Sequence, residues 1–286
     1  MQNDFEAIRR WVEESPYGAA LGIGVASLDE GSARLELPYK DQNSNPGKAL
    51  HGGCAASLAV VGGQAVTRAA LGTSTAPWHS SALQVNYLAA AIGEDVHANA
   101  TLLRRGKEMC FVEIDVATAQ GKSIAHVTTM VRARFGAEPA ELFTTRGDDG
   151  AADPGAMGPH VGKMPFTAAR GLEVEHMAGG TSRIVMPFRS QNADAAGGVH
   201  EGALLALLDT TGAMAAWGET GPGRFKASTP SLQAQVLAPP PKEDLVAYGV
   251  LVQRDGDLFW CDVEVAGALS RRVCARGTVI YRIQTS

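Results

Sequence analysis

Along the chain, segments with helix-like and strand-like spacing of hydrophobic residues follow one another in a fixed succession, and this succession occurs twice. In the first copy, helical spacing of apolar residues predicts a short helix over 5–14, and strands over 25–28 and 33–37 are expected to turn at 29–31. A nearly uncharged run over 51–71 predicts a long buried helix. Alternation of apolar and polar residues then predicts four strands, over 82–88, 96–104, 109–117 and 123–135. A central helix followed by an antiparallel meander is typical of an α+β domain whose sheet wraps the helix.

The second half of the chain repeats the first at one constant offset. The segment LPYKDQN at 37–43 aligns with MPFRSQN at 186–192, and His51 aligns with His200. Because the same offset holds over a whole unit, each copy is expected to be a domain with its own core. A stretch rich in Gly, Ala, Pro and Asp separates the copies. We therefore predict two tandem domains forming an intramolecular pseudo-dimer, with bounds of 1–135 for the first domain, 136–163 for the linker and 164–286 for the second.

Composition narrows the classes of function. The 286 residues carry a formal charge of -5 with scattered arginines, which argues against a nucleic-acid partner. No run approaches the roughly 20 apolar residues of a membrane span, and no basic-then-apolar leader begins the chain, so we expect a cytoplasmic protein without a membrane partner. The cysteines have no CxxC spacing and are expected in the core, without a metal, cofactor or disulfide: Cys54, Cys110, Cys261 and Cys274.

The most specific motif lies where each long helix is predicted to begin. The stretches are NPGKALHGG at 45–53 and HEGALLALLD at 200–209. They closely resemble the loop-to-helix entry of hotdog-fold thioesterases of the phenylacetyl-CoA type, whose pattern has an Asn six residues before a His, a Gly directly after it and an acid nine after it. The resemblance covers both copies apart from the linker. It implies two tandem hotdog domains and a metal-independent acyl-CoA thioesterase.

These residue types suit attack on a thioester carbonyl. A free N–H at a helix start, aided by the helix dipole, stabilises the negative charge that develops on the carbonyl oxygen. Gly52 fits this role because its missing side chain lets the thioester approach. An acid two turns further along such a helix can act as nucleophile or as general base for water. The Asn and His of the motif would position the water and shape the loop.

The two copies have lost different parts of the motif. The first copy keeps the loop residues but has an apolar residue at the acid position: Asn45, His51, Gly52 and Val60. The second copy keeps the acid but has changed loop residues: Asp209, with Asp194, His200 and Glu201. In dimers of the family, each site is implied to combine the loop of one subunit with the acid of the other. The resemblance thus implies one complete site per chain, and a reciprocal site that is dead or repurposed.

A polar residue at the start of the strand after the long helix assists the acid in family members. By alignment it is Thr229 beside Asp209, and Ser80 in the first copy. Three tryptophans could line an acyl pocket, although large aromatics more often belong to the core: Trp78, Trp217 and Trp260.

Each candidate also has a purely structural interpretation. Asp209 could hold a buried hydrogen bond, and His51 could satisfy the free groups of a helix start. Asn45 could be a turn residue, and Gly52 could permit close helix packing. Glu201 is interpreted as a solvated or helix-N-terminal carboxylate rather than as a replacement acid for the second site.

We expect hydrolysis of an acyl-CoA at one site between the halves, and pairing of two chains into a homodimer. The main alternative is a non-catalytic acyl-CoA binding or sensing protein, because drift has been tolerated at both sites. A hotdog hydratase is disfavoured, because no Asp and His are paired on one loop. The preferred acyl chain depends on pocket shape and stays open.

Overall fold

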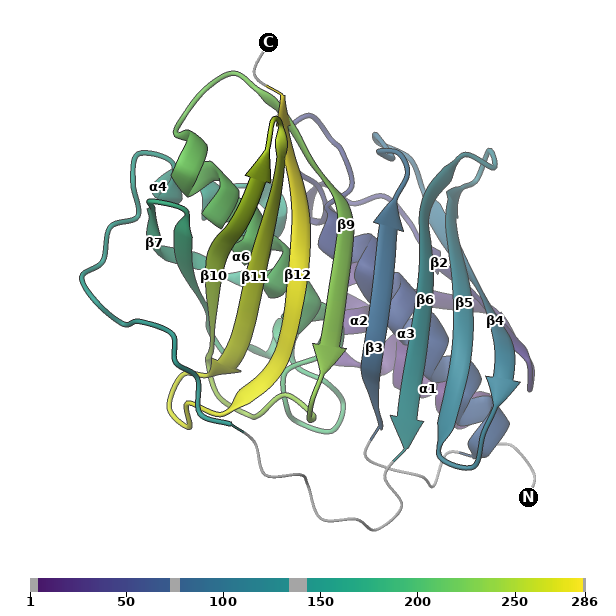
Figure 1. Ribbon diagram of the computed structural model, residues 1–286. Coiled ribbons are helices and arrows are strands. Elements are labelled where there is room, and N and C mark those ends of the chain that lie inside the picture. Colours follow the sequence, from purple (N-terminus) through teal and green to yellow (C-terminus); the bar gives the residue numbers. More distant parts are fainter. Residues whose placement is uncertain (1–4, 73–77, 134–142, 285–286) are drawn as a thin grey trace.

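A computed structural model describes residues 5–72, 78–133 and 143–284 (Figure 1). The first half contains α1 (Phe5–Glu14), α2 (Pro16–Leu21), β1 (Gly24–Leu28), β2 (Ser32–Leu37), α3 (Gly52–Leu71), β3 (Trp78–Tyr87), β4 (Val96–Arg105), β5 (Met109–Thr118) and β6 (Ser123–Ala133). The second half contains α4 (Gly158–Val161), α5 (Pro165–Arg170), β7 (Glu173–Ala178), β8 (Thr181–Met186), α6 (Glu201–Thr220), β9 (Lys226–Val236), β10 (Leu245–Asp255), β11 (Leu258–Gly267) and β12 (Val273–Gln284). A 3-10 turn precedes each long helix.

The strands of both halves form one twelve-stranded sheet in the order β1-β2-β4-β5-β6-β3-β9-β12-β11-β10-β8-β7. Every neighbouring pair is antiparallel, and β3 joins β9 at the centre. At this junction Gln84 pairs with Gln233, which is its own counterpart in the repeat. The internal two-fold axis therefore passes between these two residues. The α+β class and the pseudo-dimer predicted from the sequence are confirmed.

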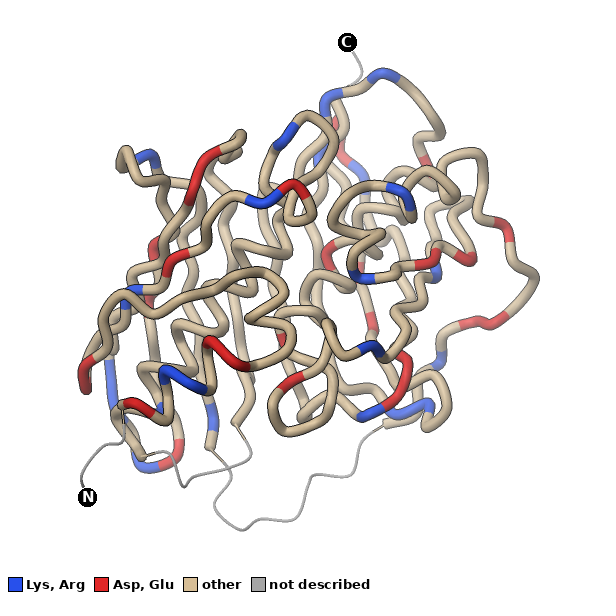
Figure 2. Tube along the Cα trace, turned by 180° about the vertical axis from the view of Figure 1, so that it is seen from behind, with Lys and Arg blue, Asp and Glu red and all other residues tan. Residues whose placement is uncertain are grey.

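The long helices α3 and α6 cover one face of this sheet and lie against each other, as the view from behind shows (Figure 2). Gly53 sits at the closest approach, where a Cβ atom would collide with the Cβ of Ala206. The equivalent Gly202 has Ser57 Oγ 2.6 Å from the position of a Cβ. Close packing is thus the role of Gly53 and of its counterpart Gly202; the structural interpretation of a packing glycine applies to Gly53. Lys and Arg positions are scattered over this side rather than gathered into a patch (Figure 2).

Helix α3 is longer and more apolar than the expectation of no membrane-length segment allows. By length and composition alone this helix could cross a membrane, contrary to our expectation for the chain. However, 89% of its most apolar window is buried inside the protein, against the sheet and α6. A helix that is apolar on all sides is also what a core position between two layers requires.

A proline and a glycine delimit the short helices that the sequence analysis did not separate. Pro16 begins α2, and Gly22 ends it with a φ of 90°. Pro165 and Gly171, with a φ of 71°, do the same for α5. Proline suits the first turn of a helix and glycine suits the left-handed residue after the last turn, so each pair fixes a helix of one or two turns.

The described part of the segment predicted as a linker packs against the second half. Residues 134–142 lie outside the described residues. In the part that follows, Thr144 forms a bridge with Arg272, and Arg183 donates to the carbonyls of Asp148 (2.8 Å) and Gly150 (2.9 Å). The domain bounds themselves stay a prediction.

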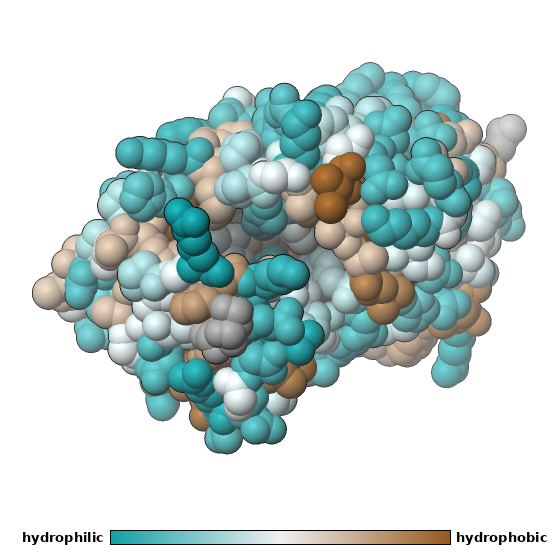
Figure 3. All heavy atoms as spheres, turned by 90° about the horizontal axis from the view of Figure 1, so that it is seen from above, coloured by the Kyte–Doolittle hydropathy of each residue, from teal (hydrophilic) through white to brown (hydrophobic). Residues whose placement is uncertain are grey.

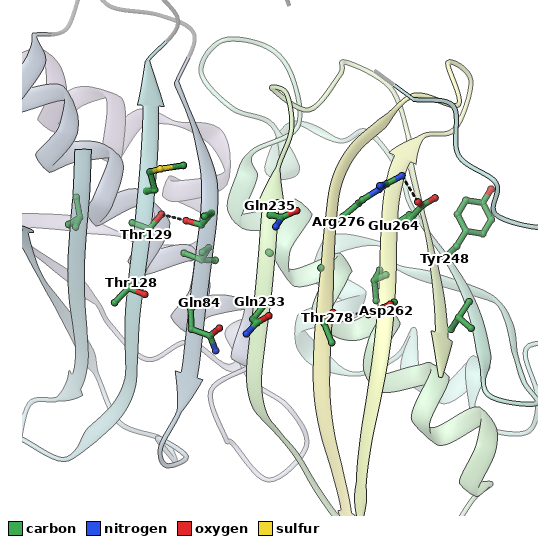
Figure 4. A pocket seen from close by; sticks show the side chains of 18 of the residues that line it. Gln84, Thr128, Thr129, Gln233, Gln235, Tyr248, Asp262, Glu264, Arg276 and Thr278 are labelled. Atoms are coloured by element: carbon green, nitrogen blue, oxygen red, sulfur yellow. Dashed lines mark hydrogen bonds and ion pairs between the residues drawn. The ribbon is translucent and has the colours of Figure 1, made fainter. Parts of the chain in front are cut away.

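The other face of the sheet carries a groove of about 880 Å³ that crosses the β3–β9 junction. Gln84, Gln233 and Thr278 point into it, and Arg276 and Glu264 form an ion pair of 2.9 Å at its side (Figure 4). The helices lie behind the sheet in this view. The groove is therefore separate from the helix starts, where the sequence places the site.

Candidate active site

The start of α3 presents a free backbone donor. His51 precedes the helix, and its Nδ1 accepts the N–H of Gly53 at 2.9 Å. The N–H of Gly52 makes no hydrogen bond to any residue in the described ranges. Because this N–H lies at the positive end of a twenty-residue helix, it is a ready donor for a developing oxyanion.

His51 is held as a neutral helix cap. It is 6% exposed and stacks on Phe166 of the other half, with 4.0 Å between ring centroids. Burial lowers the pKa of His51 to about 4, so the ring is uncharged near neutral pH. His200 repeats the arrangement, with Nδ1 accepting from Gly202 and the ring stacked on Tyr17. This geometry suits shaping of the loop and is unsuited to proton transfer.

Asp209 projects from the middle of α6 toward the start of α3. Its side chain is 5% exposed, and Oδ1 accepts a hydrogen bond of 2.8 Å from Thr229 Oγ1. Oδ2 makes no hydrogen bond within the described part of the chain, and a Cβ built on Gly52 would lie 3.1 Å from it. Burial raises the pKa of Asp209 to about 6, although the bond from Thr229 opposes the shift. A buried acid of one half therefore lies against the free helix start of the other.

Tyr87 belongs to the same site and was missed by the sequence analysis. Its hydroxyl donates to the carbonyl of Gly52 at 3.2 Å, and its ring lies 3.4 Å from where a Cβ of Gly52 would stand. Burial, and then the nearby charge of Asp209, raise the pKa of Tyr87 well above its usual range. The alignment of the halves offered a signal, because the counterpart of Tyr87 is the aliphatic Val236.

Asn45 lies in the loop that leads to α3, where its N–H donates to the carbonyl of Ala49 at 2.7 Å. The loop turns through Gly47 and Lys48, which have φ angles of 83° and 63°. No hydrogen bond joins the Asn45 side chain to Asp209 or to any other described residue. The structure thus shows no hydrogen bond between the Asn45 amide and the acid.

In the reciprocal site, at the start of α6, the side chain of Glu201 occupies the space between the two halves. Glu201 is 6% exposed, and its Oε2 accepts from Gln64 Nε2 at 2.9 Å and from the N–H of Ser80 at 3.1 Å. The interpretation of Glu201 as a solvated carboxylate is therefore wrong, whereas its place in the first turn of α6 agrees with the helix-N-terminal interpretation. The first residue of α6 points into the opposite half because Gly202 brings α6 close to α3. Val60, at the acid position of this site, is 1% exposed.

The buried Glu201 carboxyl predicts a stability that depends on pH. Burial raises its pKa from 4.5 to about 7, so the folded state binds the proton more tightly than the unfolded state does. This group therefore contributes most stability below pH 4.5, and its contribution falls as the pH rises to 7, by about 3 kcal/mol at most. Glu201→Gln should be more stable than the wild type at pH 8, and the difference should shrink at pH 5. Urea unfolding at both pH values measures it. An unchanged difference would show that Glu201 is ionised throughout.

The cysteines are buried and free, as expected for core residues: Cys54, Cys110, Cys261 and Cys274. No cluster of three or more His, Cys, Asp or Glu side chains suited to a metal ion occurs in the ranges that the structure describes. The residues at this site are thus a carboxylate, a hydroxyl, an amide donor and a phenol.

Solved structures with the same architecture define the class of fold. A conserved protein with a hot dog fold from Alicyclobacillus acidocaldarius superposes with a TM-score of 0.63 at 16% identity, covering 92% of this chain and 96% of that one. The acyl-CoA thioesterase II TesB2 of Mycobacterium marinum gives 0.63 at 11% identity, covering 93% and 96%. The chain is therefore a tandem hotdog protein, as predicted.

Sequence relatives place it more closely. Human acyl-coenzyme A thioesterase 13 is 31% identical over 124 residues, which are 42% of this chain and 86% of the relative. Residues 6–132 also match a family model described as a domain of unknown function (DUF4442). The chain belongs to the hotdog thioesterase family and is a thioester hydrolase.

Proposed function

We propose that the protein hydrolyses an acyl-CoA to the free acid and CoA at one composite site per chain. The observation that carries this proposal is that Asp209 Oδ2 of the second half lies beside Gly52 of the first, 3.1 Å from where a Cβ atom of residue 52 would stand. The name of the human relative supports CoA as the thiol. The fused halves would bring the acid and the oxyanion donor together without a partner chain.

The arrangement supports two routes. In one, Asp209 takes a proton from water, and the resulting hydroxide attacks the thioester carbon. In the other, Oδ2 itself attacks and forms a mixed anhydride, which water then hydrolyses. In both, the carbonyl oxygen gains negative charge beside the Gly52 N–H, the C–S bond breaks, and the sulfur leaves as a thiolate that takes up a proton.

The other residues would prepare this geometry. Thr229 holds Oδ1, so Oδ2 faces Gly52. His51 shapes the helix start, and Asn45 would orient water or substrate at the rim. Cytoplasmic location, pairing into a homodimer and domain bounds at 135 and 164 belong to this proposal as expectations.

The activity should depend on pH through Asp209. Because its pKa is raised to about 6 and both routes need the carboxylate, kcat/KM should fall tenfold per pH unit below about 6 and level off above it. Thr229→Val removes the bond that opposes the shift, so the acidic limb should move to higher pH. Thiol release from butyryl-CoA between pH 4.5 and 8.5 tests both statements.

Two results would count against this proposal. If the acidic limb of the kcat/KM profile does not move in Thr229→Val, a group other than Asp209 controls the pH dependence. Absence of turnover on every ester, with CoA esters still bound, would favour the alternative of an acyl-CoA binding or sensing protein.

A further inference from the structure

The Glu201 side chain in the reciprocal site indicates where an acyl group can lie in the composite site. Glu201 occupies the position of Gly52, and its side chain runs inward to Gln64 on the facing helix and to Ser80 at the start of β3. A chain of several atoms therefore fits between the two long helices, starting at the first residue of one helix. The internal two-fold axis carries this path onto the composite site.

In the composite site two of the residues that occupy this path are replaced by smaller ones. Gly52 has no side chain, and Ala213 stands where the reciprocal site has Gln64. Thr229 stands where that site has Ser80 and turns its hydroxyl to Asp209. The two side chains that fill the path in the reciprocal site are thus missing or shortened in the composite site, along a line that leads from Gly52 along α6.

An aromatic wall stands beyond Ala213 on this path. Trp217 is 7% exposed, stacks on Phe225 with ring centroids 6.0 Å apart, and donates from Nε1 to Tyr281 Oη at 3.2 Å. Burial, as the larger cause, and the charge of Asp209 raise the pKa of Tyr281 to about 12. The molecule is hollowed at the end where β9 begins and β12 ends, which is the end that carries Thr229 and Tyr281 (Figure 3).

The counterpart of Trp217 differs in chemistry. It is Arg68, whose guanidinium lies between the rings of Trp11 (4.2 Å) and Trp78 (5.4 Å) in the reciprocal site. In the reciprocal site the path runs from a carboxylate to a guanidinium, whereas in the composite site it runs from Asp209 to aromatic rings. An apolar acyl group packs better against aromatic rings than against a guanidinium, which needs polar partners when it is covered.

We propose that the acyl group lies along α6 between Asp209 and Trp217, and that Trp217 restricts it to compact groups, either short chains or single rings. The inference rests on the proposed thioesterase function. Eight residues of helix separate Asp209 from Trp217, a rise of about 12 Å, and a helical side chain leans back toward the N-terminus. Long straight chains exceed the space that is left.

The test is kcat/KM for acetyl-, butyryl-, phenylacetyl-, lauroyl- and palmitoyl-CoA with the intact chain. The wild type should prefer butyryl- or phenylacetyl-CoA to lauroyl-CoA by tenfold or more. Trp217→Ala should raise the ratio of lauroyl to butyryl about tenfold. Ala213→Gln copies the residue of the reciprocal site and should act oppositely, lowering the rate with butyryl-CoA more than with acetyl-CoA.

Trp78→Ala is the matched control, because it removes a buried tryptophan on the reciprocal side. It should leave the chain-length profile unchanged. If the wild type hydrolyses palmitoyl-CoA as well as butyryl-CoA and neither Trp217→Ala nor Ala213→Gln changes the profile, the acyl path is wrong while the thioesterase proposal stands. If no ester is hydrolysed, the function itself fails first.

Discussion

Asp209→Asn is expected to lower kcat for thioester hydrolysis by a hundredfold or more, because the amide can neither attack the carbonyl carbon nor accept a proton from water. The same substitution should stabilise the fold at pH 8. The pKa of Asp209 is raised from 3.8 to about 6, so ionisation of this buried group weakens the folded state as the pH rises through that range. A variant that is inactive and more stable separates lost chemistry from lost folding.

The matched control for Asp209→Asn is Glu201→Gln. Both substitutions neutralise one buried carboxylate beside a helix start, but Glu201 belongs to the reciprocal site. Glu201→Gln should keep at least half of the wild-type activity. If Asp209→Asn stays active, or if both variants lose activity equally, the assignment of a single catalytic acid is wrong.

Gly52→Ala is expected to lower kcat/KM by tenfold to a hundredfold with little loss of stability. The added methyl group would stand 3.1 Å from Asp209 Oδ2 and 3.4 Å from the ring of Tyr87, where the thioester has to enter. The Gly52 backbone is helical, and alanine favours a helix over glycine by up to about 1 kcal/mol, so folding should not suffer.

Gly62→Ala provides the comparison for this variant. It lies on the same helix, and its methyl group would meet Ala100 at 3.3 Å, away from Asp209. Steady-state kinetics and thermal unfolding of both variants should show an activity loss confined to Gly52→Ala. Full activity of Gly52→Ala would mean that the thioester does not approach this residue.

Most of the fold could be predicted because periodicity and the repeat agree. The helix expected over 51–71 is α3 (Gly52–Leu71), and the strand expected over 96–104 is β4 (Val96–Arg105). The strand expected over 82–88 begins earlier, at Trp78, because its first three residues are all buried and show no alternation. A strand start covered on both faces lacks the signal on which the prediction relied.

The site was predictable only where a motif marks it. The resemblance to the hotdog thioesterase motif pointed to Asp209 and Gly52, and the structure places them side by side. The inward direction of Glu201 could not be predicted, because it depends on how closely α6 approaches the other half. For Trp217 the sequence left both an acyl pocket and the core open, since nothing in it joins this residue to Phe225 and Tyr281 across the fold. Contacts between distant segments of this kind arise only in the assembled sheet.

The junction of β3 with β9 joins two hotdog units within one chain, in the way that two subunits would pair. In a pair of separate identical chains, a single mutation would change both sites together. Here the counterparts of Gly52 and Asp209 are Glu201 and Val60, so the two copies differ at both positions. Duplication within one gene therefore allows a substitution to alter one of the two helix starts and leave the other as it was.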